Sequence, residues 1–325
     1  MTDKTMTRRR FLICSTGIAA LGVGCSSSLS PLLEQCAMKS GLPQRTLGNT
    51  GVQVSLLAFG CGSVFLKGYP SDDKAQEVLE WALNSGINYF DTAHNYGNGE
   101  SERRLGLFIK GRREKVFLVT KIESRDSNNF MRQFELSLKR LQTDRVDLLH
   151  IHGLHNFEDL SKIGAHGGVY DCLVKLKNQK AAKLIGFSCH TDGEVAEKAI
   201  EQLDFDCCML QLNAANIGEF EKKALPAALN KKMGILAMKA TAQGKLLEEA
   251  PGGRLESLLH YVWSLPVSSI VLGMPKMEMA KQNVELAKNI MLMGETEIIT
   301  LRDRLSSYRP YLEKFFRHHS DLIAT

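Results

Sequence analysis

Hydrophobic segments alternate with amphipathic segments from about residue 45 onward. Eight short apolar segments have the length and the content of β-branched and aromatic residues that are typical of buried strands. They span residues 54–62, 88–93, 115–121, 146–153, 183–190, 207–213, 234–240 and 269–274. Because parallel strands are usually joined by helices, eight such repeats predict a closed (β/α)8 barrel, the TIM barrel.

The segments between the predicted strands have helical periodicity. Residues 73–86 place several apolar side chains on one face and end at Gly86, and residues 129–141 repeat this design. No G-x-G-x-x-G sequence follows the first strand, which disfavours a doubly wound dinucleotide-binding sheet. No change of composition divides the chain after residue 45, so residues 45–325 are predicted to form one domain.

The N-terminus has the pattern of an export signal. The sequence "TRRRFL" at Thr7–Leu12 leads into an apolar stretch that ends at Gly24, shorter than the roughly 20 residues of a membrane-spanning helix. It resembles a twin-arginine signal, which directs folded proteins out of the cytoplasm. Cys25 stands where a lipoprotein would be cleaved and lipidated, although Gly22 replaces the usual leucine. We therefore expect residues 1–25 to be a signal, residues 26–44 a linker, and the mature protein to be periplasmic or on the outer face of the cell envelope, anchored there if Cys25 is lipidated.

Composition and charge narrow the classes of function. The formal net charge is +5, and most of it lies in the signal-like segment, so nucleic-acid binding is not expected. The chain has 8 cysteines but no C-x-x-C pair, and therefore no zinc-ribbon or iron–sulfur motif. A protein that folds in a reducing cytoplasm before export is not expected to use a disulfide framework.

Four chemically capable residues fall at or just after consecutive strand ends. Asp91, Lys121 and His152 close the second, third and fourth strands, and Tyr96 follows Asp91 closely. In a barrel of this class these positions share one rim, where active sites lie. A lysine favours the phenolate of a tyrosine, whose pKa is about 10 in water, and a carboxylate can hold that lysine. We expect Tyr96 to be the acid/base, tuned by Lys121, which Asp91 anchors, while His152 orients a carbonyl oxygen.

These residues occur in motifs that resemble the aldo-keto reductases. The motifs are "DTAHNYG", "VTK" and "DLLHIH", together with "RTLGNTGVQVSLLAFGCG" (45–62) and "GESERRLG" (99–106). The resemblance implies a (β/α)8 barrel and an oxidoreductase that reduces aldehydes or ketones, or oxidises the matching alcohols, with NADPH or NADH. It also implies a small carbonyl or sugar-like substrate and the catalytic tetrad Asp91, Tyr96, Lys121 and His152. No role is required of His94.

The family resemblance also suggests the residues that hold the nicotinamide. Members of the family use a Ser-Asn pair after the fifth strand, and this chain has Ser188 followed by Cys189. In our alignment Met209 and Leu212 take the positions of the usual amide-binding glutamine and stacking aromatic residue. Gln211 shares a strand face with Met209 and is expected to replace the glutamine, while Leu212 would offer apolar contact only.

The last predicted strand leads into the expected phosphate site. Gly273 turns the chain, and the following helix N-terminus offers free N–H groups to phosphate. By resemblance Gly273, Lys276 and Asn283 bind the adenosine end of the cofactor, with Lys276 as a point charge because Met279 replaces the usual arginine. NADP is therefore expected slightly ahead of NAD. Gly62, at the end of the first strand segment, is also expected to line the cofactor site.

Two alternative functions, from other classes of protein, remain open. His150 and His152 lie on one strand face, as in metal-dependent barrel hydrolases, although no further ligand set is evident. A non-catalytic nicotinamide-binding barrel, acting as a sensor or partner subunit, is the other alternative. The expected location adds a constraint, because reduced cofactor is not supplied outside the cytoplasm. A tightly bound cofactor that travels with the folded protein would satisfy it.

Overall fold

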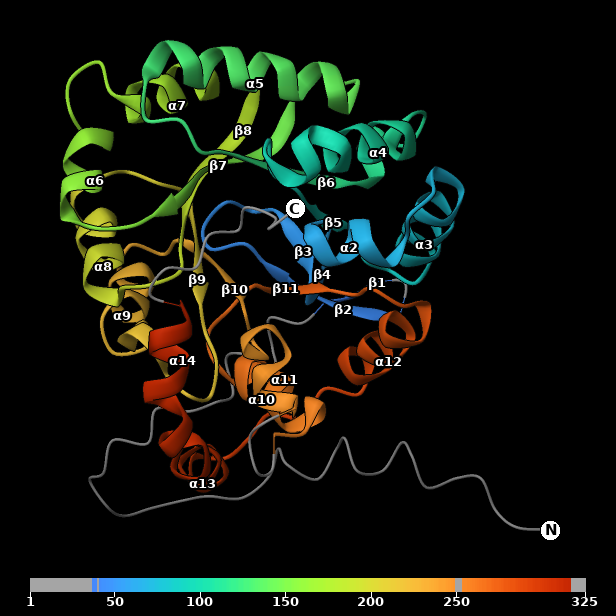
Figure 1. Ribbon diagram of the computed structural model, residues 1–325, viewed down its shortest axis with the longest axis vertical. Coiled ribbons are helices and arrows are strands. Elements are labelled where there is room, and N and C mark those ends of the chain that lie inside the picture. The colour runs from blue at the N-terminus through green and yellow to red at the C-terminus, as the bar shows by residue number, and fades with distance from the viewer. Residues whose placement is uncertain (1–36, 40, 249–252, 317–325) are drawn as a thin grey trace.

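A closed barrel of eight parallel strands forms the centre of the protein (Figure 1). The computed structural model describes residues 37–39, 41–248 and 253–316. The strands are paired in the order β10-β11-β4-β5-β6-β7-β8-β9, and β10 and β9 also pair, which closes the ring. They are β4 (Leu57–Gly60), β5 (Tyr89–Asp91), β6 (Phe117–Ile122), β7 (Val146–Leu154), β8 (Ala182–Cys189), β9 (Cys207–Gln211), β10 (Gly234–Met238) and β11 (Ser269–Gly273). The predicted (β/α)8 barrel is confirmed.

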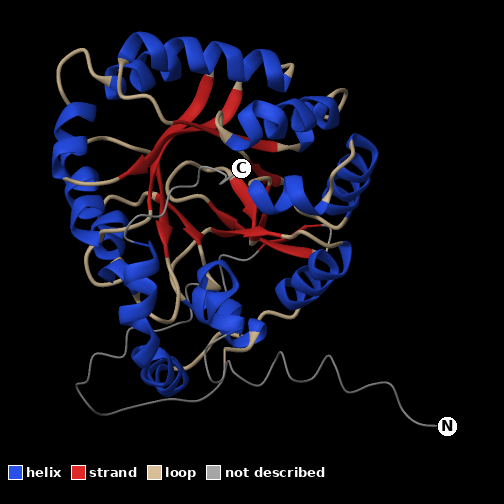
Figure 2. Ribbon diagram, in the orientation of Figure 1, coloured by secondary structure: helices blue, strands red, loops and turns tan. Residues whose placement is uncertain are grey.

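Helices surround the barrel on its outer side (Figure 2). The predicted helices at 73–86 and 129–141 correspond to α3 (Asp72–Asn84) and α5 (Ser127–Leu141). The remaining α-helices are α2 (Ser63–Gly68), α4 (Glu100–Ile109), α6 (Phe157–Ile163), α7 (Val169–Asn178), α8 (Gly193–Gln202), α9 (Ala224–Asn230), α10 (Lys245–Glu248), α11 (Leu255–Ser264), α12 (Met277–Lys288), α13 (Glu295–Leu305) and α14 (Arg309–Phe316). Short 3-10 turns include η2 (Tyr96–Gly99), η3 (Arg113–Lys115), η4 (Ile217–Glu219), η5 (Ala242–Gly244) and η6 (Ser306–Tyr308). Within the described ranges no helix is long and apolar enough to cross a membrane.

A small antiparallel sheet precedes the barrel. It consists of β1 (Ala37–Lys39), β2 (Leu42–Thr46) and β3 (Gln53–Ser55). The first predicted strand therefore divides into β3 and β4, and part of the segment predicted as a linker is strand. The buried Arg45 anchors this sheet, because its guanidinium donates to the carbonyls of Val267 at 2.7 Å and Trp263 at 3.0 Å. The predicted signal and Cys25 lie outside the described residues.

Two hydrophobic clusters lie on opposite faces of the strands. Phe90, Leu118 and Leu149 belong to the outer cluster, which the helices cover. Their neighbours in sequence belong to the inner cluster, which fills the barrel. Successive strand residues point to opposite faces, so this alternation is the expected two-residue period. The inner cluster comprises Leu47, Val54, Ala58, Tyr89, Phe117, Val119, Leu148, Leu184, Cys207, Met209, Leu236 and Met238.

Candidate active site

The predicted catalytic residues stand directly above the inner cluster. Asp91 lies two residues beyond Tyr89, Lys121 two beyond Val119, and His152 four beyond Leu148. The two-residue period therefore turns their side chains to the barrel interior at the carboxyl ends of β5, β6 and β7. Because the apolar side chains on the same strand faces pack inside the barrel, these polar side chains also point to the interior, at the barrel mouth.

Lys121 connects the acid to the tyrosine. Its ammonium donates to Oδ1 of Asp91 and to the backbone carbonyl of Thr92 at 2.8 Å. Lys121 and Asp91 are only 2% and 3% exposed, so the ion pair is nearly excluded from water. The Nζ atom also lies 5.2 Å from the centroid of the Tyr96 ring. A cation held at this distance favours negative charge on the phenol oxygen.

His152 completes the group from the next strand. Its ring lies 5.7 Å from the Tyr96 ring, centroid to centroid, and the two planes are nearly perpendicular at 81°. Both side chains are largely buried. The structure therefore brings together Asp91, Tyr96, Lys121 and His152, the four residues that the strand-end pattern predicted.

The turn that carries Tyr96 depends on glycine. In η2 the backbone of Gly97, Asn98 and Gly99 is left-handed, and φ reaches +93° at Gly99. This φ strains any residue that has a Cβ atom, and a Cβ at Gly99 would also lie 2.1 Å from Cζ of Arg140, which would have to move. This turn is compact because the guanidinium of Arg140 occupies the space and donates to the carbonyl of His94 at 3.0 Å.

His94, for which the sequence predicted no role, connects the turn to a neighbouring helix. Its Nδ1 atom lies 3.0 Å from the hydroxyl of Ser137 on α5, on the outer side of the site. Burial, reinforced by the charge of Arg140, lowers the pKa of His94 to about 4. The neighbouring carboxyl of Glu102 is fully buried, and burial raises its pKa although Thr120 and Arg140 bind it. His94 is therefore neutral at physiological pH and joins the turn to α5.

Of the residues predicted to hold the nicotinamide, some face the barrel interior and others do not. Gln211 is 1% exposed and faces the interior, and neither atom of its amide has a hydrogen-bond partner among the described residues. An orphaned amide at this position suits the donor and acceptor of a nicotinamide carboxamide. The hydroxyl of Ser188 accepts from the backbone N–H of Gly153 at 2.9 Å and keeps its own proton to donate. Both residues therefore fit the cofactor.

Cys189 and Leu212 occupy the other strand face. The thiol of Cys189 donates to the carbonyls of Leu154 at 3.3 Å and Asp192 at 3.4 Å, and burial raises its pKa to about 11. Leu212 packs in the outer cluster with Leu210. Its position argues against the predicted contact of Leu212 with the nicotinamide ring.

The predicted phosphate site lies where β11 meets α12. Lys276 is the N-cap residue of α12, and no side chain caps that helix end. Gly273 leads into this turn, and Asn283 is buried with its Oδ1 atom lacking a partner in the described chain. A Cβ atom at Gly62 would lie 3.5 Å from the Tyr96 ring, so Gly62 lies against this tyrosine. These residues keep backbone and amide groups open at the cofactor's expected position.

The two histidines of β7 do not form a metal centre. His150 is fully buried above Gly186, where a Cβ atom would come within 2.9 Å of the imidazole. Burial, followed by the charge of Lys121 and the neighbouring His152, lowers the pKa of His150 well below its usual value. Over residues 41–248 and 253–316, no further histidine, cysteine or carboxylate joins them in a set of three metal ligands. The structure thus gives the hydrolase alternative no support.

A cleft of about 450 Å³ opens at the same end of the barrel. It lies between the loops after β7, β8 and β9 and helix α14, and its walls are mixed polar and apolar. The lining includes His155, Asn156, Asp192, Glu313 and Phe316. Strand-end loops of this kind decide the substrate in barrel enzymes.

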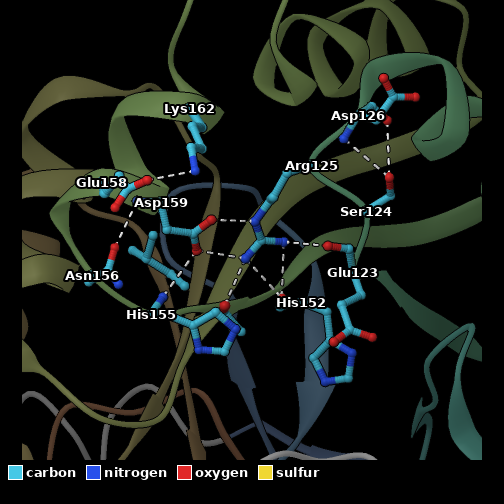
Figure 3. A network of polar contacts seen from close by, with 12 residues as sticks. Glu123, Ser124, Arg125, Asp126, His152, His155, Asn156, Glu158, Asp159 and Lys162 are labelled. Atoms are coloured by element: carbon cyan, nitrogen blue, oxygen red, sulfur yellow. Dashed lines mark hydrogen bonds and ion pairs between the residues drawn. The ribbon is translucent and has the colours of Figure 1, made fainter.

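Arg125 is the functional candidate that the sequence did not reveal. It follows β6 and binds Asp159 and the end of β7, as Figure 3 shows. No local pattern marks this residue, because an arginine in a polar loop is usually a solvent-exposed charge. Its partners on β7 and α6 are distant in the chain and meet only in the folded barrel.

The protein is a (β/α)8 barrel with four candidate catalytic residues on one rim, and comparison with known proteins supplies the family. Residues 56–257 match the model of the aldo/keto reductase family. The chain belongs to this family of oxidoreductases that act on carbonyl groups. The resemblance inferred from the motifs is thereby confirmed.

Relatives and solved structures agree with this assignment. The chain is 27% identical to L-galactose dehydrogenase of Arabidopsis thaliana over 77% of this chain and 89% of that protein. It is 29% identical to D-threo-aldose 1-dehydrogenase of a Pseudomonas species, over 63% and 72% of the two chains. An aldo/keto reductase from Klebsiella pneumoniae, solved with NADP and acetate, has a TM-score of 0.64 at 19% identity and covers 80% of this chain and 94% of its own. This last likeness concerns the fold.

Proposed function

We propose that this protein is an NAD(P)-dependent reductase of aldehyde or ketone groups, or a dehydrogenase of the matching alcohols. The observation that carries the proposal is the buried Lys121, bound to Asp91 and placed beside the ring of Tyr96. Packing alone does not explain this lysine, because an apolar pair of similar volume is often at least as stabilising as a buried ion pair. Its position suits proton transfer through the phenol.

Each of the four residues would have a separate role in the reaction. Tyr96 donates a proton to the carbonyl oxygen during reduction and accepts it during oxidation. Lys121 stabilises the phenolate that remains after donation, and Asp91 keeps the ammonium in place. His152, whose ring lies across that of Tyr96, orients the same carbonyl oxygen. A bound nicotinamide dinucleotide would supply or accept the hydride.

The cofactor assignment rests on the buried polar side chains of Gln211, Ser188 and Asn283 and on the open N-terminus of α12. Gln211 and Ser188 would bind the carboxamide, while Gly273, Lys276 and Asn283 would bind the adenosine end. We favour NADP over NAD because Lys276, at the N-terminus of α12, adds a positive charge to the free N–H groups. The NADP bound by the Klebsiella structure is consistent with this choice.

Support for a substrate class comes from the relatives and from the cleft, which lies beside the site and is lined by none of the four candidate catalytic residues. Hydrogen-bonding side chains such as His155, Asn156 and Glu313 line the cleft, which suits a polyhydroxylated molecule. The two relatives named above act on L-galactose and on D-threo-aldoses by their names. We therefore propose a small sugar or sugar-like carbonyl compound as substrate.

Replacing the phenol tests the catalytic assignment directly. Tyr96→Phe removes the proton donor but keeps the ring, so we expect carbonyl reduction to fall by at least about 100-fold. Dinucleotide binding, followed by quenching of protein fluorescence, should stay within about twofold of wild type, since the ring is retained. Turnover close to wild type would remove Tyr96 from its role, and binding of NADPH with no turnover of any carbonyl by wild type would favour the sensor alternative.

We further propose that the protein is exported folded with its cofactor bound. The support is the twin-arginine pattern at Thr7–Leu12 and the reducing equivalents that a reductase needs. Lipid anchoring at Cys25 is part of this proposal. Protein purified from the periplasm should release a nicotinamide dinucleotide on denaturation, measured by absorbance. Absence of dinucleotide together with weak binding of added NADPH would contradict it, and mass spectrometry of the mature N-terminus tests the lipid.

A further inference from the structure

Strand β7 contains an irregularity at the catalytic histidine. Ile151 lies opposite Phe187, but Leu154 lies opposite Cys189, so two residues of β7 face one residue of β8. The two residues are His152 and Gly153, and the backbone of Gly153 is left-handed with φ +68°. A bulge of this kind interrupts the hydrogen-bond ladder and redirects the local side chain. The carbonyls at the bulge therefore need donors from outside the ladder.

The guanidinium of Arg125 supplies those donors. Both Nη atoms of Arg125 lie 3.2 Å from the carbonyl oxygen of His152, and Nη2 donates to the carbonyl of Gly153 at 2.7 Å (Figure 3). A third carbonyl, that of Glu123, accepts from Nη1 at 2.8 Å. The planar guanidinium presents five donors in a fixed fork, whereas a lysine has three donors on a single atom.

Asp159 fixes the guanidinium in turn. Its two carboxylate oxygens accept from Nε at 2.7 Å and from Nη2 at 2.8 Å, a bidentate pair. Both side chains are mostly buried, at 18% and 12% exposed. Burial pushes the pKa of Asp159 up, but the hydrogen bonds and charge of Arg125 outweigh it, so the net pKa is lowered. The same carboxylate accepts from the backbone N–H of His155 at 3.1 Å.

We propose that Arg125 and Asp159 form a positioning pair that holds the bulged end of β7 and so sets the orientation of His152. The pair joins the loop after β6 to helix α6 across the carboxyl end of β7. Arg125 also donates hydrogen bonds to the backbone carbonyl of the catalytic histidine itself. It does not touch the reacting atoms. Its role rests on the proposed carbonyl chemistry, because it acts only through His152, and it extends to His155, which lines the cleft.

The chain offers a matched control at the opposite end of the same strands. Arg113 also binds an aspartate and two backbone carbonyls: Asp147 at 2.8 Å, Val116 at 2.9 Å and Arg145 at 3.1 Å. Its exposure, 15%, is close to that of Arg125. Arg113→Met therefore removes comparable contacts near the amino ends of β6 and β7, far from His152.

The experiment compares Arg125→Met, Arg125→Lys and Arg113→Met in steady-state reduction of a carbonyl substrate. We expect Arg125→Met to lower kcat by about 10- to 100-fold with KM within about threefold, since a displaced orienting group costs rate more than affinity. Arg125→Lys should recover part of the loss, and Arg113→Met should keep wild-type kcat. Asp159→Asn, which keeps the shape of the side chain, serves as a second variant if Arg125→Met does not fold.

A second readout separates this proposal from the proposed function. In spectra of protein labelled with 15N-histidine, the His152 ring signals, assigned through His152→Gln, should move in Arg125→Met and stay in Arg113→Met. That comparison holds even if wild type reduces no carbonyl, a result that would count against the proposed function alone. The positioning role is overturned if Arg125→Met leaves the His152 signals and kcat at wild-type values. It is equally overturned if Arg113→Met lowers kcat as much as Arg125→Met.

Discussion

Removal of the Lys121 charge is the sharpest test of the catalytic geometry. Lys121→Met preserves most of the side-chain volume but deletes the ammonium that lies 5.2 Å from the Tyr96 ring. With the ring centroid taken as the position of the phenolate charge and an effective dielectric constant of about 20, two unit charges interact by about 3 kcal/mol. If this energy stabilises the phenolate formed in the transition state, kcat should fall by about 100-fold. The loss should appear in single-turnover rates with dinucleotide saturating.

Stability must be separated from catalysis in this test, because Lys121→Met leaves the carboxylate of Asp91 buried without its cation. Breaking a buried ion pair on one side costs about 3–5 kcal/mol. The double variant Asp91→Asn/Lys121→Met removes both charges, so urea unfolding should show part of that stability restored while kcat stays low. The electrostatic argument is refuted if Lys121→Met keeps kcat within threefold of wild type under conditions in which Tyr96→Phe is inactive.

Three further predictions concern single side chains. The pKa of His94 is about 4 in the folded protein and 6.5 when unfolded, so the unfolded state alone binds a proton between these values. The free energy of unfolding should therefore fall by about 1–2 kcal/mol between pH 6.5 and 4.5 in urea titrations, and His94→Asn should lose much of that decrease. Gly186→Ala should lower the melting temperature sharply, since its Cβ atom would lie 2.4 Å from the carbonyl oxygen of Cys207; a normal melting curve would show that the barrel can expand there. Gln211→Leu should weaken NADPH binding by about tenfold in titration calorimetry, and unchanged affinity would exclude the orphaned amide from the cofactor site.

The sequence predicted the barrel and the tetrad for a physical reason. Two-residue and helical periodicities are local properties, and eight alternations leave few ways to bury every strand on both faces. Once the strands are parallel, residues at their carboxyl ends must meet on one rim, which is why Asp91, Lys121 and His152 could be placed together in advance. His94 could be set aside because no role in the predicted chemistry required it.

Other features depended on contacts between distant segments. The segment 54–62 reads as one strand, but β3 pairs with β2 and only β4 enters the barrel. The outer position of Leu212 follows from the strand register, which an alignment of motifs does not fix. In each case the local pattern permitted two arrangements, and pairing with another part of the chain selected one.

The local sequence pattern predicts the barrel, the acid, phenol, lysine and imidazole, and the rim on which they lie. How His152 is held depends instead on contacts that form only in the folded chain. A bulge is an extra residue relative to a partner strand, so it does not exist until β7 meets β8. Arg125 and Asp159 satisfy the carbonyls that the bulge releases, and they come from loops and helices whose meeting depends on the closed barrel.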